Sequence, residues 1–348
     1  MMTSYNLYGH LLVRLDTDHK GYRKYFDNEY ARISRSEAAG EDASRITVAI
    51  VSELPAAEPG DIRRVVRFKK LFTFQYVVRG LESRDVTIYF KRHWVDRVYM
   101  NAIGVYLQAQ VLEPLMYFKL LQENILFMHA GGVTKDDMGI LLPAYGGTGK
   151  TTLSMALLNQ GHKLLGDDLL LVDVASGIVH PYPRPLHIFT YNVRNLRGAK
   201  IPFKYTFAVY FKNVLRYPLE RILRTEFLIS TRIHADELFE GDIFGTSSPY
   251  GAIAFLRKQG PAAEIVEITQ SNVDEIADGI AESADLNDSL NELLQGEPAL
   301  WSEAQRLEHE TIVALLRSRG VIAYVNTRAM DLDNLENFSE TILPVAQA

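Results

Sequence analysis

The sequence predicts an α/β fold, with α+β elements, built around a phosphate-binding loop. Residues 144–152 read AYGGTGKTT, which follows the pattern G-x-x-x-x-G-K-[ST] except that alanine holds the first position. An apolar run at 140–142 precedes this segment as a strand should, and apolar residues recur at helical spacing through 152–160. A pair of aspartates, Asp167 and Asp168, follows at the edge of further apolar runs.

The loop itself is expected to bind the triphosphate of ATP. Small residues let backbone N–H groups curl around phosphate oxygens, and the following helix directs its positive end at the same anion. Lys150 can reach the β- and γ-phosphates, and the Thr151 hydroxyl can hold Mg²⁺. A glycine-rich surface turn is the alternative, which the flanking strand and helix disfavour. The expected nucleotide-binding residues of the loop are Tyr145, Gly146, Gly147, Thr148, Gly149, Lys150, Thr151 and Thr152.

The aspartate pair is expected to complete the site. Two adjacent carboxylates at the edge of apolar runs are costly to bury unless a cation pairs with them, and Mg²⁺ on a nucleotide is a natural candidate. Adjacent side chains of a strand point to opposite faces. One of Asp167 and Asp168 is therefore expected to address the metal and the other the attacking hydroxyl. A polar strand end without chemistry is the alternative, and the nearby phosphate loop favours the site.

Short strands around the loop predict a mixed, hairpin-rich sheet. A strand at 125–133 and a turn at 135–139 lead into 140–142 as an antiparallel hairpin. A second hairpin is expected from 169–174 and 178–180. A fully parallel core would instead need long crossover helices between its strands.

These residues resemble the HPr kinase/phosphorylase and PEP carboxykinase superfamily. The resemblance rests on the hairpin with His129, on GGTGKTTLS and on GHKLLGDD, and it covers roughly residues 126–173. The segments GTGKTTLS and LLGDD are most similar in sequence to PEP carboxykinases. The single GH-x-L-x-x-DD phrase and the chain length are closer to HPr kinase and its shorter relatives, some of which phosphorylate serine on peptides or small molecules.

The resemblance implies a role for each residue. Asp167 is expected to act as general base, Asp168 to help Thr151 hold the metal, Lys150 to stabilise the transferred charge, and His129 to lie near the catalytic centre. Without the resemblance, a lone histidine in an apolar strand reads as a hydrogen-bonded core residue. The arginine signature of HPr recognition and the carboxylate-binding domain of PEP carboxykinases are not found. A PEP carboxykinase-like lyase and a non-catalytic ATP-binding regulatory module are the alternatives to an ATP-dependent kinase acting on a serine-type hydroxyl.

A basic segment follows the aspartate pair. Within 184–224 Glu220 is the only acidic residue, although the whole chain has a net charge of −6. The segment is a candidate surface for an anionic acceptor, and Arg184, between two prolines, is expected to contact phosphate. Its interleaved aromatic residues would also suit RNA, and a solvated face on an aromatic core is the plain alternative. The basic residues are Arg184, Arg194, Arg197, Lys200, Lys204, Lys212, Arg216, Arg221 and Arg224.

Three regions are expected along the chain. Residues 1–100 read as a β-rich module, 101–270 as the kinase-like core with a leading helix at 101–123, and 271–348 as a mainly helical region. Pro114 is expected to kink the leading helix. The last region should contain helices at 274–294 and 302–318 and a late strand at 320–325.

Composition excludes several classes of protein. The 348 residues are 47% hydrophobic and include no cysteine, which allows a sizeable core and rules out disulfides and thiolate metal sites. The net charge gives no global reason to expect nucleic acid or an anionic membrane as partner. The sequence shows no secretory signal and no apolar run long enough to span a bilayer. We therefore expect a cytoplasmic enzyme that acts on a protein, peptide or small molecule, with a homo-oligomer left open.

Overall fold

The computed structural model divides into two compact units. The first comprises Met1–Phe127 with Asp285–Glu308, and the second Met128–Ala284 with His309–Ala348, so that the division falls within β7 (Ile125–Met128) and α9 (Pro298–Arg319). The residues that the structure describes are 2–38, 40, 43–68, 72–94, 96–182, 184–188, 207, 210–211, 231–284, 286–332, 334–335 and 338–342.

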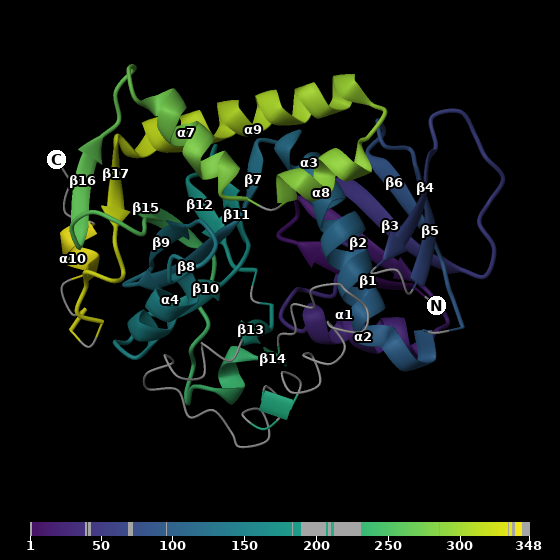
Figure 1. Ribbon diagram of the computed structural model, residues 1–348, viewed down its shortest axis with the longest axis horizontal. Helices are drawn as coiled ribbons and strands as arrows, with labels where there is room; N and C mark the ends of the chain where they lie inside the picture. Colours follow the sequence, from purple (N-terminus) through teal and green to yellow (C-terminus); the bar gives the residue numbers. More distant parts are fainter. Residues whose placement is uncertain are drawn as a thin grey trace. The chain divides into compact units, whose positions relative to one another are not determined.

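The first unit contains a mixed six-stranded sheet in the order β1-β2-β3-β6-β5-β4 (Figure 1). β2, β3 and β6 are parallel to one another, and the other neighbours are antiparallel. Alternate residues of β6, among them Val86, Ile88 and Phe90, are buried, which is the period expected of a sheet with one covered face. The strands are β1 (Met2–Leu7), β2 (Leu11–Asp16), β3 (Ser44–Val51), β4 (Ile62–Phe68), β5 (Phe72–Arg79) and β6 (Asp85–Lys91).

The leading helix of the sequence prediction is interrupted by a π-helical turn. α2 (Asp96–Leu107) continues as the π-helix η1 (Gln108–Leu112) and then as α3 (Glu113–Leu121), which packs on β2 and β3. Pro114 explains the interruption, because proline has no N–H and its ring would collide with the carbonyl group four residues earlier. The predicted kink therefore takes the form of a wider turn just before the proline. The unit also contains α1 (Lys20–Glu29) and α8 (Leu286–Leu293).

The second unit is built on a mixed sheet that includes both predicted hairpins. β8 pairs with β9, and β11 with β12, in antiparallel fashion, which confirms the hairpin predictions. The predicted strand at 125–133 is two strands, β7 and β8, with His129 between them. The strands are β8 (Ala130–Lys135), β9 (Met138–Pro143), β10 (Lys163–Gly166), β11 (Leu170–Asp173), β12 (Ile178–His180), β15 (Ser248–Leu256), β16 (Ala263–Glu267) and β17 (Val321–Val325), with a separate pair β13 (Leu186–Ile188) and β14 (Thr231–Ile233).

Three neighbouring strands of this sheet run parallel. β15 lies between β9 and β17 and is parallel to both, and Ala144 forms a further parallel bridge to Leu256. The late strand predicted at 320–325 is therefore confirmed as β17 and lies in the same sheet as the strand before the loop. The carboxyl ends of β9, β15 and β17 meet at one edge, where ligands of open α/β sheets commonly bind.

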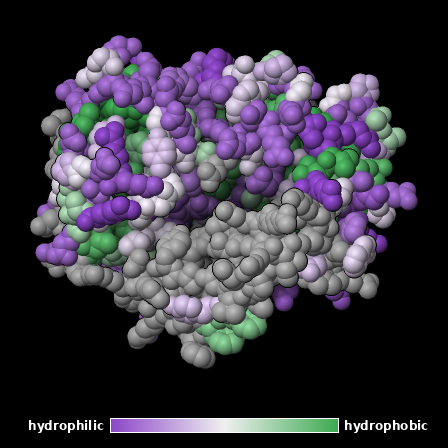
Figure 2. Space-filling model, in the orientation of Figure 1, coloured by the Kyte–Doolittle hydropathy of each residue, from purple (hydrophilic) through white to green (hydrophobic). Residues whose placement is uncertain are grey.

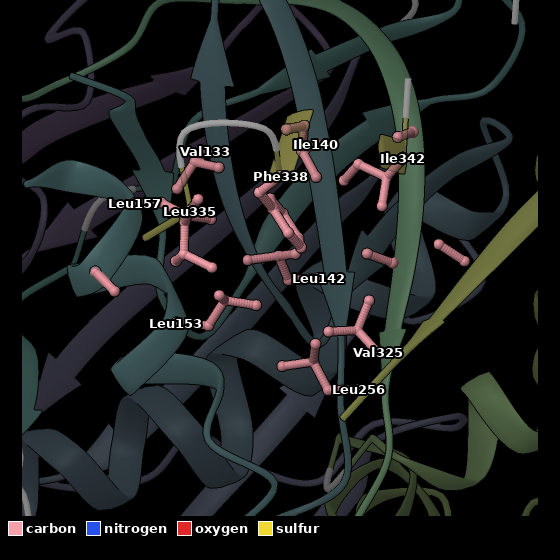
Figure 3. Close-up of a cluster of buried hydrophobic side chains, with 14 of the residues drawn as sticks. Val133, Ile140, Leu142, Leu153, Leu157, Leu256, Val325, Leu335, Phe338 and Ile342 are labelled. Atoms are coloured by element: carbon pink, nitrogen blue, oxygen red, sulfur yellow. The ribbon is translucent and has the colours of Figure 1, made fainter. Parts of the chain in front are cut away.

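The helix after the loop packs on one face of these strands. In Figure 3 the side chains of Leu153 and Leu157, from α4 (Lys150–Leu158), lie close to Ile140 and Leu142 of β9 in one apolar cluster. Phe338 of α10 (Phe338–Ile342) belongs to the same cluster. This packing fixes the start of α4 against the end of β9, so the intervening loop is held at both ends.

The opposite face of the parallel strands is covered by α7 (Val273–Glu282). A Cβ on Gly279 would lie 3.6 Å from the Phe255 ring of β15. The sequence predicts one helix over 274–294, but α7 ends at Ser283, whose hydroxyl donates back to the carbonyl oxygen of Ile280. α9 begins earlier than predicted, at Pro298, which suits a first turn because it lacks an N–H.

A membrane-spanning helix needs a minimum length and hydropathy. Within the described residues, no helix is both long enough and apolar enough to cross a bilayer. On the face drawn in Figure 2, hydrophilic side chains cover most of the described surface.

His162 is a buried histidine that joins the end of α4 to α10. Its Nδ1 lies 3.1 Å from the carbonyl oxygen of Leu157, and its Nε2 lies 2.7 Å from the hydroxyl oxygen of Ser339. Because a carbonyl can only accept, Nδ1 carries the hydrogen and Nε2 accepts from Ser339. Burial disfavours the charged ring and lowers the pKa of His162 to about 4.

This low pKa predicts an acid-sensitive fold. The unfolded chain takes up a proton on this ring near its ordinary pKa of about 6.5, whereas the folded protein does so only near 4, so acid favours the unfolded state between these values. From pH 7 to pH 5 the ring should remove about 2 kcal/mol from the free energy of unfolding. Urea unfolding should therefore show a larger loss in wild type than in His162→Gln. His180→Gln is the control, and equal losses in wild type and His162→Gln would contradict this account.

Candidate active site

The loop between β9 and α4 is rich in glycine and open on one side. Gly147 and Gly149 have φ values of 73° and 97°, which favour glycine, and a Cβ on Gly146 or Gly147 would meet nothing within 4 Å. The open side of the loop therefore has room for an anion at the start of α4. Ala144 has no positive φ and is buried, so alanine satisfies the position where the usual pattern has glycine.

A cluster of charged side chains faces the start of α4. Lys150 Nζ lies 3.0 Å from His129 Nε2 and 3.6 Å from Asp168 Oδ1. Asp168 Oδ1 lies 3.2 Å from His129 Nε2, and its Oδ2 accepts a 2.5 Å hydrogen bond from Arg184 Nη2. Three basic side chains thus converge on one carboxylate. The structure brings together all four of these predicted site residues, which are up to 55 positions apart in the chain (184 minus 129).

His129 is oriented by the end of α7. Its Nδ1 lies 2.8 Å from the backbone oxygen of Ser283, so Nδ1 must carry a hydrogen and donate it. In the neutral ring, Nε2 then accepts from Lys150; in the protonated ring, Nε2 donates to Asp168. The hydrogen bond to Ser283, which belongs to no sequence motif, therefore orients the His129 ring toward the charged cluster.

The two aspartates have different surroundings. Asp167 Oδ2 accepts a 2.8 Å hydrogen bond from the Thr151 hydroxyl, whereas its buried Oδ1 has no hydrogen-bond partner among the described residues. Burial raises the pKa of Asp167. The charge of Lys150 and the hydrogen bond from Thr151 lower it, but by less, so the net shift is upward. Burial also raises the pKa of Asp168, but the bond with His129 and the charges of Lys150 and Arg184 outweigh it and hold that pKa well below its usual range.

The oxygen atoms beside Thr151 fit a magnesium ion bound together with a nucleotide. The Thr151 hydroxyl donates to Asp167 Oδ2, the Oδ1 of Asp167 has no partner among the described residues, and the next residue, Asp168, is a carboxyl with a lowered pKa. Within the described residues, no group of three or more histidine or acidic side chains could hold a metal ion. Mg²⁺ typically takes one or two protein ligands and completes its shell with phosphates and water, so this small donor set suits it.

Arg184 is the one basic residue of the segment that lies within the described residues, and it belongs to the charged cluster. Its side chain is 9% exposed, and its guanidinium carbon lies 5.8 Å from the centroid of the Tyr182 ring. It reaches Asp168 in the structure, as its predicted place soon after the aspartate pair allows. The basic residues from Arg194 to Arg224 lie outside the described residues.

Two residues outside the motifs shape the loop and Lys150. A Cβ on Gly131 of β8 would lie 3.0 Å from Lys150 Cγ, so this glycine makes room for the lysine stem. Thr327, just after β17, donates a 2.6 Å hydrogen bond to the carbonyl oxygen of Thr148 and lies against Gly149. Neither residue belongs to a sequence motif. The parallel arrangement of β9 and β17 could have indicated Thr327, because residues just after parallel strands meet at one edge.

Thr327→Val is expected to weaken nucleotide binding. Valine preserves the shape but removes the donor, so the Thr148 carbonyl loses its partner at a cost of about 1–2 kcal/mol. Isothermal titration calorimetry should show ATP bound roughly 5- to 30-fold more weakly than by wild type. Thr134→Val, at a similarly buried threonine of β8, is the matched control. An unchanged dissociation constant for Thr327→Val would show that the hydrogen bond does not hold the loop.

Comparison with known proteins adds little to this geometry. No protein-family model matches the chain, and no curated protein matches it in sequence. Among solved structures, it is similar to the HPr(Ser) kinase/phosphatase from Coxiella burnetii, with 18% identity, 40% of this chain and 76% of that chain covered, and a TM-score of 0.22. At that TM-score the likeness carries no argument about function.

Proposed function

We propose that this chain is an ATP-dependent kinase of the HPr kinase-like class, which transfers the γ-phosphoryl group to a serine-type hydroxyl. The observation that carries the proposal is the convergence of Lys150, His129, Arg184 and the aspartate pair at the start of α4. A structural cluster would need only enough cations to neutralise its carboxylates. Here one carboxylate is surrounded by three basic groups, while the other keeps a free buried oxygen.

The different pKa shifts support one assignment of the two carboxylates. A base should have a raised pKa and a free lone pair, as Asp167 has, and a metal ligand should stay ionised, as Asp168 does. Asp167 therefore accepts the proton of the attacking hydroxyl, and Asp168 and Thr151 would hold Mg²⁺. The ion would neutralise charge on the phosphates. Asp167→Asn and Asp168→Asn test this assignment against the reverse one, in which Asp167 and Thr151 would hold the ion.

Lys150 and Arg184 change partners when nucleotide binds. Both side chains pair with Asp168 in this structure. The phosphates of ATP offer these cations stronger, multidentate acceptors, so the transferred group is stabilised by charges already positioned in the site. His129 stays fixed through its Nδ1 and keeps Nε2 beside Lys150 and Asp168.

Transfer of label from ATP tests the activity. The protein is incubated with Mg²⁺, γ-labelled ATP and cell extract, and the protein, peptide and metabolite fractions are separated. Label should enter one of these fractions with wild type but not with Lys150→Ala. Release of labelled inorganic phosphate alone, or no release, would refute the kinase. Carbon dioxide release from oxaloacetate would support a PEP carboxykinase-like lyase, and ATP binding without turnover would support a regulatory module.

The acceptor, in this proposal, is anionic or has an anionic carrier. The support is the basic composition of 184–224, which begins at Arg184 in the site. Exposed basic contacts are screened within about 8 Å at physiological ionic strength, so salt should weaken acceptor binding more than ATP binding.

Replacing Arg194, Arg197 and Lys200 together by serine is expected to raise the KM for the acceptor and leave the KM for ATP nearly unchanged. The reason is that three positive charges near the acceptor are lost while the phosphate loop stays intact. Steady-state kinetics with the labelled acceptor measure both constants. Unaltered acceptor kinetics, with an unchanged circular dichroism spectrum, would instead indicate a solvated face.

A further inference from the structure

Tyr145 is an exposed aromatic side chain within the phosphate loop. Tyr145 is 39% exposed. Ala144 before it and Thr148 three residues after it are only 1% and 4% exposed. The two residues that follow it, Gly146 and Gly147, have open space where a side chain would be. A large aromatic ring therefore lies beside the open side of the loop. Its exposed part does not pack in the hydrophobic core.

The ring of Tyr145 is held from behind by a row of aromatic side chains. It stacks on Phe255 with ring centroids 5.6 Å apart and planes inclined by 30°. Phe255 in turn contacts Tyr324 at 6.0 Å, and the guanidinium carbon of Arg257 lies 3.1 Å from the Tyr324 centroid. Phe255 and Tyr324 are only 4% and 7% exposed. One face of the Tyr145 ring is thus covered by a fixed support, which reduces the ordering cost of binding a planar group on the exposed part.

The row lies at the edge of the sheet where a ligand is expected. Tyr145, Phe255 and Tyr324 come from the carboxyl ends of the parallel neighbours β9, β15 and β17. We propose that Tyr145 is the stacking surface for the base of the nucleotide whose phosphates the loop binds. This inference rests on the proposed function, because it assigns the base of the same ATP.

Stacking predicts a particular specificity. Every base has a π-face, so a tyrosine ring binds bases through contact area with little reading of their hydrogen-bonding edges. ATP and GTP should therefore bind about equally well through this contact, and both better than CTP or UTP, whose rings are smaller. Loss of the ring should remove this preference for purines.

Comparison of ATP with inorganic tripolyphosphate isolates the base. Calorimetry with Mg²⁺ and either ligand is performed on wild type, Tyr145→Phe and Tyr145→Leu. Phenylalanine keeps the ring and should retain ATP binding, whereas leucine should weaken ATP binding roughly 10-fold or more and leave tripolyphosphate within about twofold of wild type. Tyr99→Leu, at another exposed tyrosine, is the matched control. Circular dichroism shows whether each variant is folded.

Each outcome decides the assignment. Equal weakening of ATP and tripolyphosphate in Tyr145→Leu, or weakening of neither, would overturn the stacking role while leaving the phosphate site in place. A wild-type protein that binds neither ligand would refute the nucleotide site and this inference with it. Lys150→Ala separates the phosphate site from the stacking role, because it should weaken the binding of ATP and of tripolyphosphate alike.

Discussion

Replacing Asp167 by asparagine is expected to lower phosphoryl transfer roughly 100-fold or more, the usual scale for loss of a general base. Asparagine can still accept the hydrogen bond from Thr151, but it cannot take up the proton of the attacking hydroxyl. ATP affinity should change little. Folding stability should not fall, because a buried carboxyl with a raised pKa is itself costly to the fold. Label transfer to the identified acceptor, ATP titration and thermal unfolding measure the three quantities.

Asp168→Asn is the partner experiment, and it separates the two carboxylates. It removes the charge of a proposed Mg²⁺ ligand, so half-maximal transfer should need more Mg²⁺ than in wild type. Asp242→Asn, at an exposed aspartate, is the control and should behave as wild type. If the Mg²⁺ requirement rises with Asp167→Asn instead, the roles of the two aspartates are reversed. Near-normal transfer by both variants would show that neither acts in catalysis.

Lys150→Ala is expected to weaken ATP·Mg²⁺ binding by about 1.5–3 kcal/mol, which is roughly 10- to 150-fold in the dissociation constant. The substitution removes a charge-assisted contact to the phosphates. It also leaves Asp168 with His129 and Arg184 as partners, so the fold should persist. Calorimetry with ATP measures the loss. Lys163→Ala, in the exposed ion pair with Asp242, is the matched control. Equal ATP affinity of Lys150→Ala and wild type would refute the loop as a nucleotide site.

Local sequence signals predicted the centre of the second unit. Glycines that need positive φ, a short apolar strand and a helical repeat define the loop between β9 and α4, and each signal acts over a few neighbouring residues. Turn residues likewise predicted the β8–β9 and β11–β12 hairpins. The mixed α/β class follows from these signals without knowledge of the long-range pairings.

Contacts between segments far apart in the chain could not be predicted from such local sequence signals. The carbonyl group that orients His129 belongs to Ser283, and a backbone oxygen carries no residue signature. The predicted helix over 274–294 also failed here, because its apolar spacing continues through the point where Ser283 ends α7. The π-helical turn before Pro114 shows the same limit, since proline predicts a disturbance but not the hydrogen-bond pattern that accommodates it.

The bond between Thr327 and Thr148 joins residues 179 positions apart in the chain. The glycine-rich loop is therefore braced by a strand that leaves the ribosome long after the loop itself has been made. A nascent chain halted before β17 would contain every residue of the phosphate-loop motif but would lack the hydrogen bond from Thr327 to the loop backbone. Full affinity for nucleotide should thus appear late in synthesis, after β17 docks beside β15.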